Sequence, residues 1–186
     1  MTSIKYIDPD GDEQTLDPAS YYLDPMDPAT QERTPRLLPA WKRWLAQNLS
    51  ANWATTDFIC GALIGPLLAA YPTLIPRMRE WANHRNMWVR RASAVALIVP
   101  MRRGLALDEG YTVAMTLHPN KEDLIQKAVG WMLREAGKQD LPRLGRYLRA
   151  NGAVIPRTTL RYAIERFPEV RRRRLLVITK AAVKGY

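Results

Sequence analysis

The chain has 186 residues, of which 47% are hydrophobic, and its formal net charge is +10 at pH 7. This length and apolar content suit one domain or a short repeat array with a hydrophobic core, and they exclude a chain that is disordered throughout. The single cysteine, Cys60, excludes an intramolecular disulfide framework and indicates a reducing compartment.

Residues 1–35 form an acidic, proline-rich segment. They hold eight acidic side chains against Lys5 and Arg33, a charge of −6, whereas residues 36–186 carry +16. Asp-Pro steps oppose helix formation and favour turns and extended chain. We therefore expect an irregular segment, either a tail or an arm against the basic body, which Tyr21, Tyr22 and Leu23 could anchor.

The N-terminus lacks the basic and apolar regions of a signal peptide, and no uninterrupted apolar run reaches the length of a membrane span. The sequence therefore predicts a cytoplasmic protein that does not bind a membrane.

From Arg36 onward, apolar residues recur with helical spacing. Four similar segments start near residues 53, 88, 122 and 157, at steps of 35, 34 and 35 residues. Residues suited to helix starts lie at or just before these points, namely Ser50 or Asn52, Asn86, Asn120 and Pro156. The pattern predicts a helical repeat.

A second helix is expected after each of these segments, over 72–83, 107–117, 140–151 and 168–182, and 37–49 would be the partner of the first. Paired helices at this period form an α-solenoid. The predicted fold is therefore all-α, a solenoid of about four HEAT-like helical pairs over 36–186, preceded by the acidic segment 1–35.

Equivalent positions of repeated helices line one face. Asp57, Arg91, Lys127 and Arg161 stand 34, 36 and 34 residues apart, so they should form a ladder. Helical spacing adds three side chains to this face, Trp53, Trp131 and Arg134. Cations suit backbone phosphates, and indoles suit sugars or bases. Taken alone, Trp131 could be a core residue and Asp57 an ion-pairing surface acid; their common register favours a functional site.

Three ordered stretches, "NWATTD", "WANHRNMWVRRASAVALI" and "DLIQKAVGWMLREAGK", resemble the AlkD-type DNA glycosylases of the HEAT-like DNA alkylation repair superfamily. The resemblance runs from about Trp41 to Thr179. Trp53 and Asp57 match the family's Trp-x-x-x-Asp pair, Arg91 matches the arginine of its Trp-x-x-Arg turn, and Trp131 matches the tryptophan of its Gly-Trp-x-Leu-Arg motif.

The resemblance implies hydrolysis of the N-glycosidic bond of cationic alkylated purines, such as N3-methyladenine and N7-methylguanine, in duplex DNA, without a tight pocket for a flipped base. It implies catalytic roles for Asp57, Trp53 and Trp131. The expected DNA-binding residues are Arg91, Lys127, Arg134 and Arg161. Arg91 would hold a phosphate near the lesion and could orient Asp57. We expect a monomer that uses no cofactor.

Two other classes of function stay open from the sequence. One is a noncatalytic HEAT-like module that binds nucleic acid, and the other is a scaffold whose basic groove takes acidic proteins. His84 and His118 are too isolated to predict a metal site with Cys60. The run of arginines at 171–174 begins the last expected helix and suits either DNA contacts or a solvated face.

Overall fold

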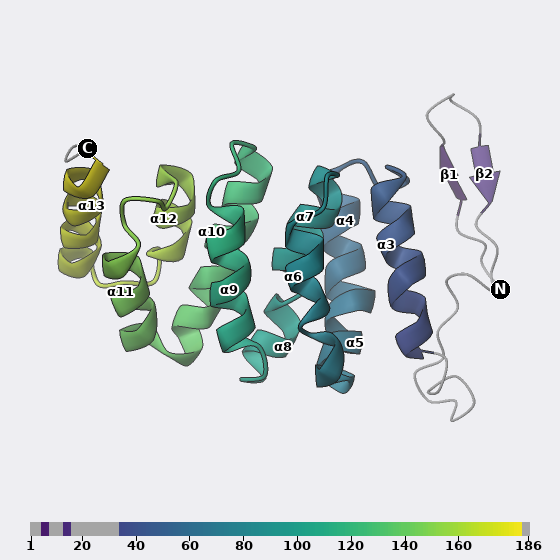
Figure 1. Ribbon diagram of the computed structural model, residues 1–186, viewed down its shortest axis with the longest axis horizontal. Helices are drawn as coiled ribbons and strands as arrows, with labels where there is room; N and C mark the ends of the chain where they lie inside the picture. The colour runs from purple at the N-terminus through teal and green to yellow at the C-terminus, as the bar shows by residue number, and fades with distance from the viewer. Residues whose placement is uncertain (1–4, 8–12, 16–33, 184–186) are drawn as a thin grey trace.

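The computed structural model describes residues 5–7, 13–15 and 34–183, and from Thr34 onward these residues form a row of helices. Figure 1 shows the row running from α3 at one end to α13 at the other. The helical elements are η1 (Thr34–Leu37), α3 (Leu38–Ala46), α4 (Trp53–Ile59), η2 (Cys60–Ile64), α5 (Gly65–Ala70), η3 (Pro72–Leu74), α6 (Arg77–Ala82), α7 (Met87–Val95), α8 (Ile98–Arg102), α9 (Leu107–Leu117), α10 (Asp123–Gln139), α11 (Leu141–Ala150), α12 (Arg157–Ala163) and α13 (Glu169–Val183). The predicted all-α solenoid is confirmed.

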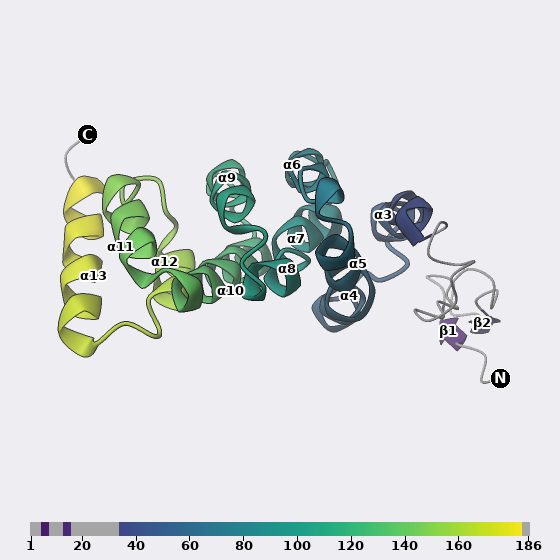
Figure 2. The same cartoon turned by 90° about the horizontal axis from the view of Figure 1, so that it is seen from below.

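Two layers of helices build the row. Figure 2 shows α3, α6 and α9 in one layer and α4, α7 and α10 in the other. Within the second layer α4 contacts α7, α7 contacts α10, and α10 contacts α12. The core lies between the layers, where large side chains are fully buried, among them Trp41, Leu45, Leu68, Leu97, Met101 and Leu133. Each pair of helices thus buries its apolar stripes against its neighbours.

The first helices of the repeats begin at residues 53, 87, 123 and 157, close to the predicted starts. The side chain of Asn52 accepts a hydrogen bond from the Thr55 backbone N–H, and that of Asn86 accepts one from the Trp88 N–H, so both cap their helices. Asn120 does not cap α10, because its side-chain amide donates to the Leu117 carbonyl and Glu122 takes the capping position.

Ion pairs connect successive repeats. Glu135 on α10 is 2% exposed and accepts hydrogen bonds from Arg102 on α8 and from Lys138 one turn along its own helix, at 2.9 and 2.7 Å. The other pairs between repeats are Arg79 with Glu109, Arg90 with Glu122, Arg91 with Asp57, Arg134 with Glu165 and Arg143 with Asp108. Six arginines of the described helices are therefore paired across repeat boundaries.

The first repeat helix runs unbroken over Trp53–Ala70 but contains a π turn. The Gly65 N–H donates to the Cys60 carbonyl, five residues back, and the following residue, Pro66, has no N–H to donate. A Cβ at Gly65 would lie 2.7 Å from Val99 Cγ2 and 2.8 Å from the Cys60 oxygen. Glycine therefore allows α5 to lie close to α8.

This same helix is apolar on average, although no uninterrupted apolar run in it reaches the length of a membrane span. By length and composition, Trp53–Ala70 could cross a membrane, with a mean hydropathy of 1.4 over 18 residues. One such helix is weak evidence for a membrane span, since core helices pass the same test. Cys60, Ile64 and Leu68 on this helix lie buried in the core.

The first helix of the second repeat is expected to be continuous over 87–103, but it is interrupted between α7 and α8 at residues 96–97. Pro100 explains the break, because proline lacks the N–H that would donate to the Ala96 carbonyl and its ring crowds that oxygen.

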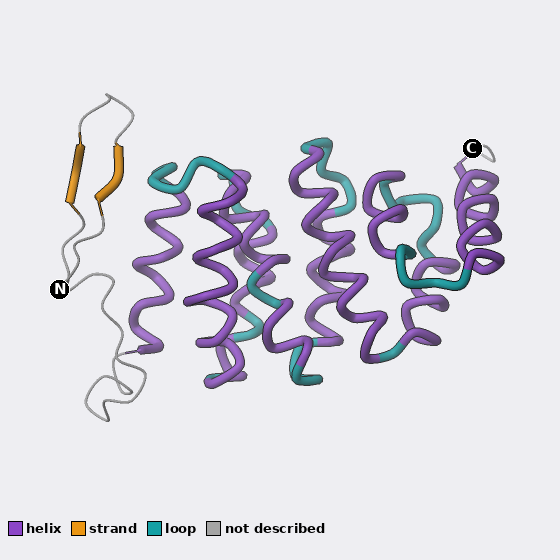
Figure 3. Tube along the Cα trace, turned by 180° about the vertical axis from the view of Figure 1, so that it is seen from behind, coloured by secondary structure: helices purple, strands orange, loops and turns teal. Residues whose placement is uncertain are grey.

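The described part of the N-terminal segment is a short antiparallel hairpin, with β1 (Lys5–Ile7) paired to β2 (Glu13–Thr15) and Tyr6 opposite Gln14. Figure 3 shows the two strands at the end of the row next to α3. The sequence predicted no strands here; the Asp-Pro-Asp-Gly-Asp stretch between them has a composition that favours a hairpin turn. The suggested anchors Tyr21, Tyr22 and Leu23 lie outside the described residues.

Candidate functional site

A cleft of about 390 Å³ opens on the first helices of the four repeats. The residues that line it come from α4, α7, α10 and α12, and they are Trp53, Asp57, Arg91, Leu124, Lys127, Trp131, Arg134 and Tyr162. Six of the seven site residues expected from the sequence therefore lie together.

Asp57 and Arg91 form a two-pronged ion pair at the base of this cleft. Arg91 Nε donates to Asp57 Oδ1 at 2.9 Å, and Arg91 Nη2 donates to Asp57 Oδ2 at 2.7 Å. Arg91 Nη1 donates to the Leu124 carbonyl on α10. Only 6% of the Arg91 side chain and 17% of the Asp57 side chain are exposed. The carboxylate is thus held in one orientation by helices from three repeats.

The start of α4 sets the position of Asp57. Asn52 caps the helix, and the Thr56 hydroxyl donates to the Ser50 carbonyl at 3.1 Å, which ties the first turn to the preceding chain. Trp53 is the first residue of the helix, so Asp57 follows it by one turn on the same face. Below them Cys60 is fully buried, and burial raises the pKa of its thiol well above the usual range. Cys60 is therefore an inert packing residue.

Three aromatic side chains line the cleft together with the carboxylate. Trp53 is 57% exposed, and Tyr162 is 38% exposed. Trp131 is half-buried, because part of its indole packs against the core while it also lines the cleft. Both sequence-based interpretations of Trp131, as a core residue and as a site residue, thus describe part of its environment.

The two cations of α10 at the cleft make ion pairs near the surface. Lys127 Nζ lies 2.6 Å from Asp123 Oδ2, and this hydrogen bond raises the pKa of the lysine. Arg134 pairs with Glu165. The solvent-exposed pair of Lys127 contributes little to stability, so this lysine can exchange its partner for a ligand at small cost. The Arg134 side chain is only 22% exposed, so its pair is more costly to break.

Arg161 does not line the cleft, although the ladder included it. Its side chain is exposed, and Tyr162 occupies the position that corresponds to Lys127 one repeat earlier. The reason is the contact between α10 and α12 at Gly130, where an added Cβ would lie 2.4 Å from the Tyr162 Cβ. This close approach turns Tyr162 toward the cleft, and a step of 35 residues from Lys127, rather than 34, would have identified it.

The described residues contain no group of three or more His, Cys, Asp or Glu side chains that could hold a metal ion. His118 is 4% exposed and its Nε2 lies 2.7 Å from the Tyr147 hydroxyl, so it belongs to the packing between α9 and α11.

A family model described as "DNA alkylation repair enzyme" matches residues 19–167. The match includes every residue that lines the cleft and ends just before α13. No curated protein matches the chain significantly.

Proposed function

The chain belongs to the DNA alkylation repair enzyme family, and from this premise we propose that it is a DNA glycosylase. Its substrates would be cationic alkylated purines in duplex DNA, such as N3-methyladenine and N7-methylguanine, and its reaction the hydrolysis of their N-glycosidic bond. The observation that carries the proposal is the oriented Asp57 carboxylate in a cleft that is also lined by aromatic and cationic side chains.

Asp57 would act on the charge that develops during bond cleavage. Alkylation makes the purine a cationic leaving group, and as the bond breaks positive charge moves onto the deoxyribose, in a transition state that resembles an oxocarbenium ion. A fixed carboxylate beside C1′ stabilises that charge and can orient the attacking water. Arg91 occupies one acceptor position on each Asp57 oxygen, and the remaining lone pairs are available to the sugar and the water.

Trp53, Trp131 and Tyr162 would hold the damaged nucleotide. Aromatic faces pack on sugar C–H groups and attract cations, so they favour both the alkylated base and the charged transition state. The open cleft fits an enzyme that holds the sugar and backbone instead of enclosing a flipped base.

Lys127, Arg134 and Arg161 would bind phosphates. Arg161 is exposed, and 41% of the Lys127 side chain and 22% of the Arg134 side chain are exposed. Arg91 is chiefly a positioning residue in this proposal, because its guanidinium is buried on Asp57 and on the Leu124 carbonyl. Its two remaining N–H groups could still reach a phosphate.

The test is release of N7-methylguanine and N3-methyladenine from methylated duplex DNA under single-turnover conditions. Asp57→Asn should lower the rate at least about 100-fold, the loss typical of removing one charge-stabilising group, while DNA affinity is kept. Asp108→Asn is the matched control, since it makes the same charge change at an exposed position of α9 outside the cleft and should leave the rate unchanged.

If the wild-type protein binds duplex DNA but releases no methylated base, the glycosylase proposal fails and a noncatalytic DNA-binding module is the better description. If it does not bind duplex DNA even at low salt, the scaffold for acidic proteins is favoured.

A further inference from the structure

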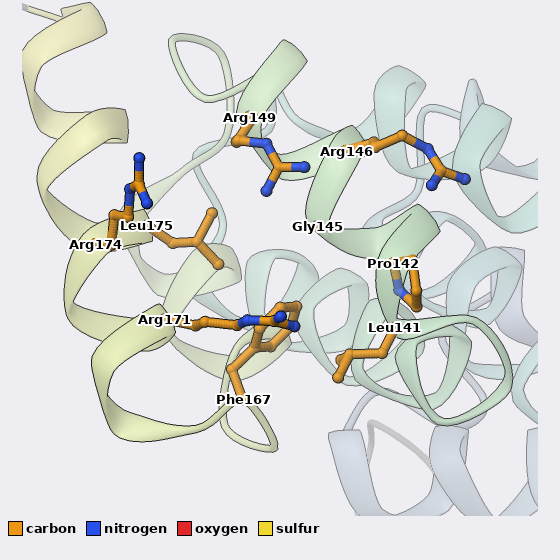
Figure 4. Close-up of a pocket in the computed structure, with 9 residues that line it drawn as sticks. All are labelled: Leu141, Pro142, Gly145, Arg146, Arg149, Phe167, Arg171, Arg174 and Leu175. Carbon is orange, nitrogen blue, oxygen red and sulfur yellow. The ribbon is translucent and has the colours of Figure 1, made fainter.

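A second cleft, of about 560 Å³, lies between α11 and α13 at the C-terminal end of the row. Figure 4 shows Arg146 and Arg149 on α11 and Arg171 and Arg174 on α13, with Leu175 between the two helices. Each pair of arginines is three residues apart, so its members are neighbours on one helix face. All four arginines line the cleft; in Figure 4 the Arg149, Arg171 and Arg174 side chains lie around the space between the helices, and the Arg146 guanidinium points away from α13.

No carboxylate lines this cleft, and none of its four arginines forms an ion pair with an acidic side chain in the described part of the chain. Their neighbours on α13 behave differently, because Arg172 and Arg173 both pair with Glu169, the latter at 2.7 Å. Four unpaired like charges repel one another, so an anion bound among them would gain far more than one bound at an isolated arginine.

The floor of the cleft is apolar and well packed. Phe167 and Leu175 are 7% and 4% exposed, and Leu141 and Pro142 complete the wall on the α11 side. An apolar wall lowers the local dielectric and strengthens the field of the arginines above it. The guanidinium fork matches the oxygens of a phosphate group, and the two facing pairs suit several phosphates on one chain better than a single ion.

We infer that this cleft binds the sugar-phosphate backbone of nucleic acid as a second contact, separate from the Asp57 cleft. The two clefts share no lining residue, and one is built on α4, α7, α10 and α12 while the other is built on α11 and α13. Arg171 and Arg174 lie beyond residue 167, where the family match ends. The inference rests on the DNA partner that the proposed function assumes, but not on base release.

The test is the salt dependence of binding to undamaged duplex DNA, measured by fluorescence anisotropy for three proteins. Besides wild type, these are the cleft variant Arg171→Gln/Arg174→Gln and the control Arg172→Gln/Arg173→Gln, which removes the same charge from the same helix. Each phosphate contact contributes about 0.9 to the slope of log K against log salt. Loss of two phosphate contacts in the cleft variant should therefore reduce the magnitude of this slope by about 1.8, and the control should leave the slope unchanged.

The pair on α11 gives an independent check, because Arg146→Gln/Arg149→Gln should reproduce the loss of slope. These four side chains are exposed, so circular dichroism should show unchanged helix content in both cleft variants. If the cleft variants and the control have the same slope, the inference is wrong.

Competition with pyrophosphate and with a polyglutamate peptide tests whether the cleft prefers nucleic acid to a small phosphate or an acidic protein. A nucleic-acid site predicts that neither competes with duplex DNA at equal charge concentration. If either ligand binds wild type and loses its binding in the cleft variants, while DNA binding does not change, the nucleic-acid assignment is overturned. All arms use undamaged DNA, so a failure of glycosylase activity in wild type would not affect this result.

Discussion

At the scale of single residues, the Arg91 guanidinium makes a set of bonds that no other side chain can reproduce. It donates to both oxygens of Asp57 and to a carbonyl of the next repeat, and lysine has neither the planar fork nor the reach to make all three bonds. We expect Arg91→Lys to slow base release about 10- to 100-fold, since small misplacements of a catalytic group have effects of this size.

Single-turnover rates and equilibrium affinities of Arg91→Lys, measured side by side, check this prediction. A positioning role requires a slower chemical step with nearly unchanged affinity for DNA. A loss of affinity with an unchanged rate would instead make Arg91 a phosphate contact.

His118 predicts a pH dependence of folding. Burial lowers its pKa from 6.5 to about 4, so between these values the unfolded chain binds a proton that the folded chain does not, and stability falls as pH falls. From pH 7.5 to 5.5 the loss should be about 1 kcal/mol. Urea denaturation at both pH values checks this. His118→Gln should remove most of the loss. Burial also lowers the pKa of His84, the only other histidine, but this residue is less buried, so His84→Gln should keep most of the loss.

At the scale of elements, two glycines in helices provide opposite tests of packing. A Cβ at Gly130 would meet Tyr162 and the Thr159 backbone between α10 and α12, whereas nothing lies within 4 Å of the corresponding atom at Gly61. Gly130→Ala should therefore lower the free energy of unfolding by about 1–3 kcal/mol, and Gly61→Ala should leave it unchanged or raise it by up to about 1 kcal/mol.

Urea denaturation of the two variants measures these differences. Equal stability of Gly130→Ala and wild type would mean that α12 can move away from α10, and the position of Tyr162 at the cleft would then not depend on this contact.

Repeat starts were the elements most predictable from the sequence, because apolar spacing and capping residues such as Asn52 and Asn86 act locally. The break at Pro100 also had a local signal, which the expected continuous helix overlooked. The hairpin was missed because Asp-Pro steps were interpreted as irregular chain. The π turn at Gly65 depends on the approach of α5 to α8, which apolar spacing does not report.

The candidate site also contains residues that the sequence predicts and residues that it does not. Trp53, Asp57, Arg91 and Trp131 were predictable from register together with the family resemblance. Tyr162 was not, because a shift of one residue turns a helical side chain by about 100°, and the phase of α12 is set by its contact with Gly130. The burial of Arg91 could not be predicted either, since it requires the Leu124 carbonyl of another repeat.

At the scale of the whole molecule, each repeat contacts only its neighbours, so stability should be distributed unevenly along the row. The last helix, α13, packs on α11 and has no repeat beyond it among the described residues. We expect Leu175→Ala, at a buried position of α13, to speed hydrogen exchange in α11–α13 only. Leu133→Ala in central α10 should speed it in α7, α10 and α12 as well.

Hydrogen exchange measured by mass spectrometry checks this pattern. Both substitutions remove a buried leucine side chain, which costs about 2–5 kcal/mol, so they are matched in chemistry and differ in place. Uniformly faster exchange along the whole row in both variants would show that the array unfolds as a single cooperative unit.

Four side chains form a row across the repeats, in the order Asp57, Arg91, Lys127 and Tyr162. The row begins with an acid, continues with two cations and ends with an aromatic ring, so it is asymmetric and has a direction. A DNA strand also has a direction. If a deoxyribose lies at Asp57, the phosphates on its 5′ and 3′ sides face different chemistry, and the two antiparallel strands of a duplex cannot fit equally. The order of the repeats should thus let the protein bind a DNA strand in one 5′-to-3′ orientation in preference to the other, without a contact to any base.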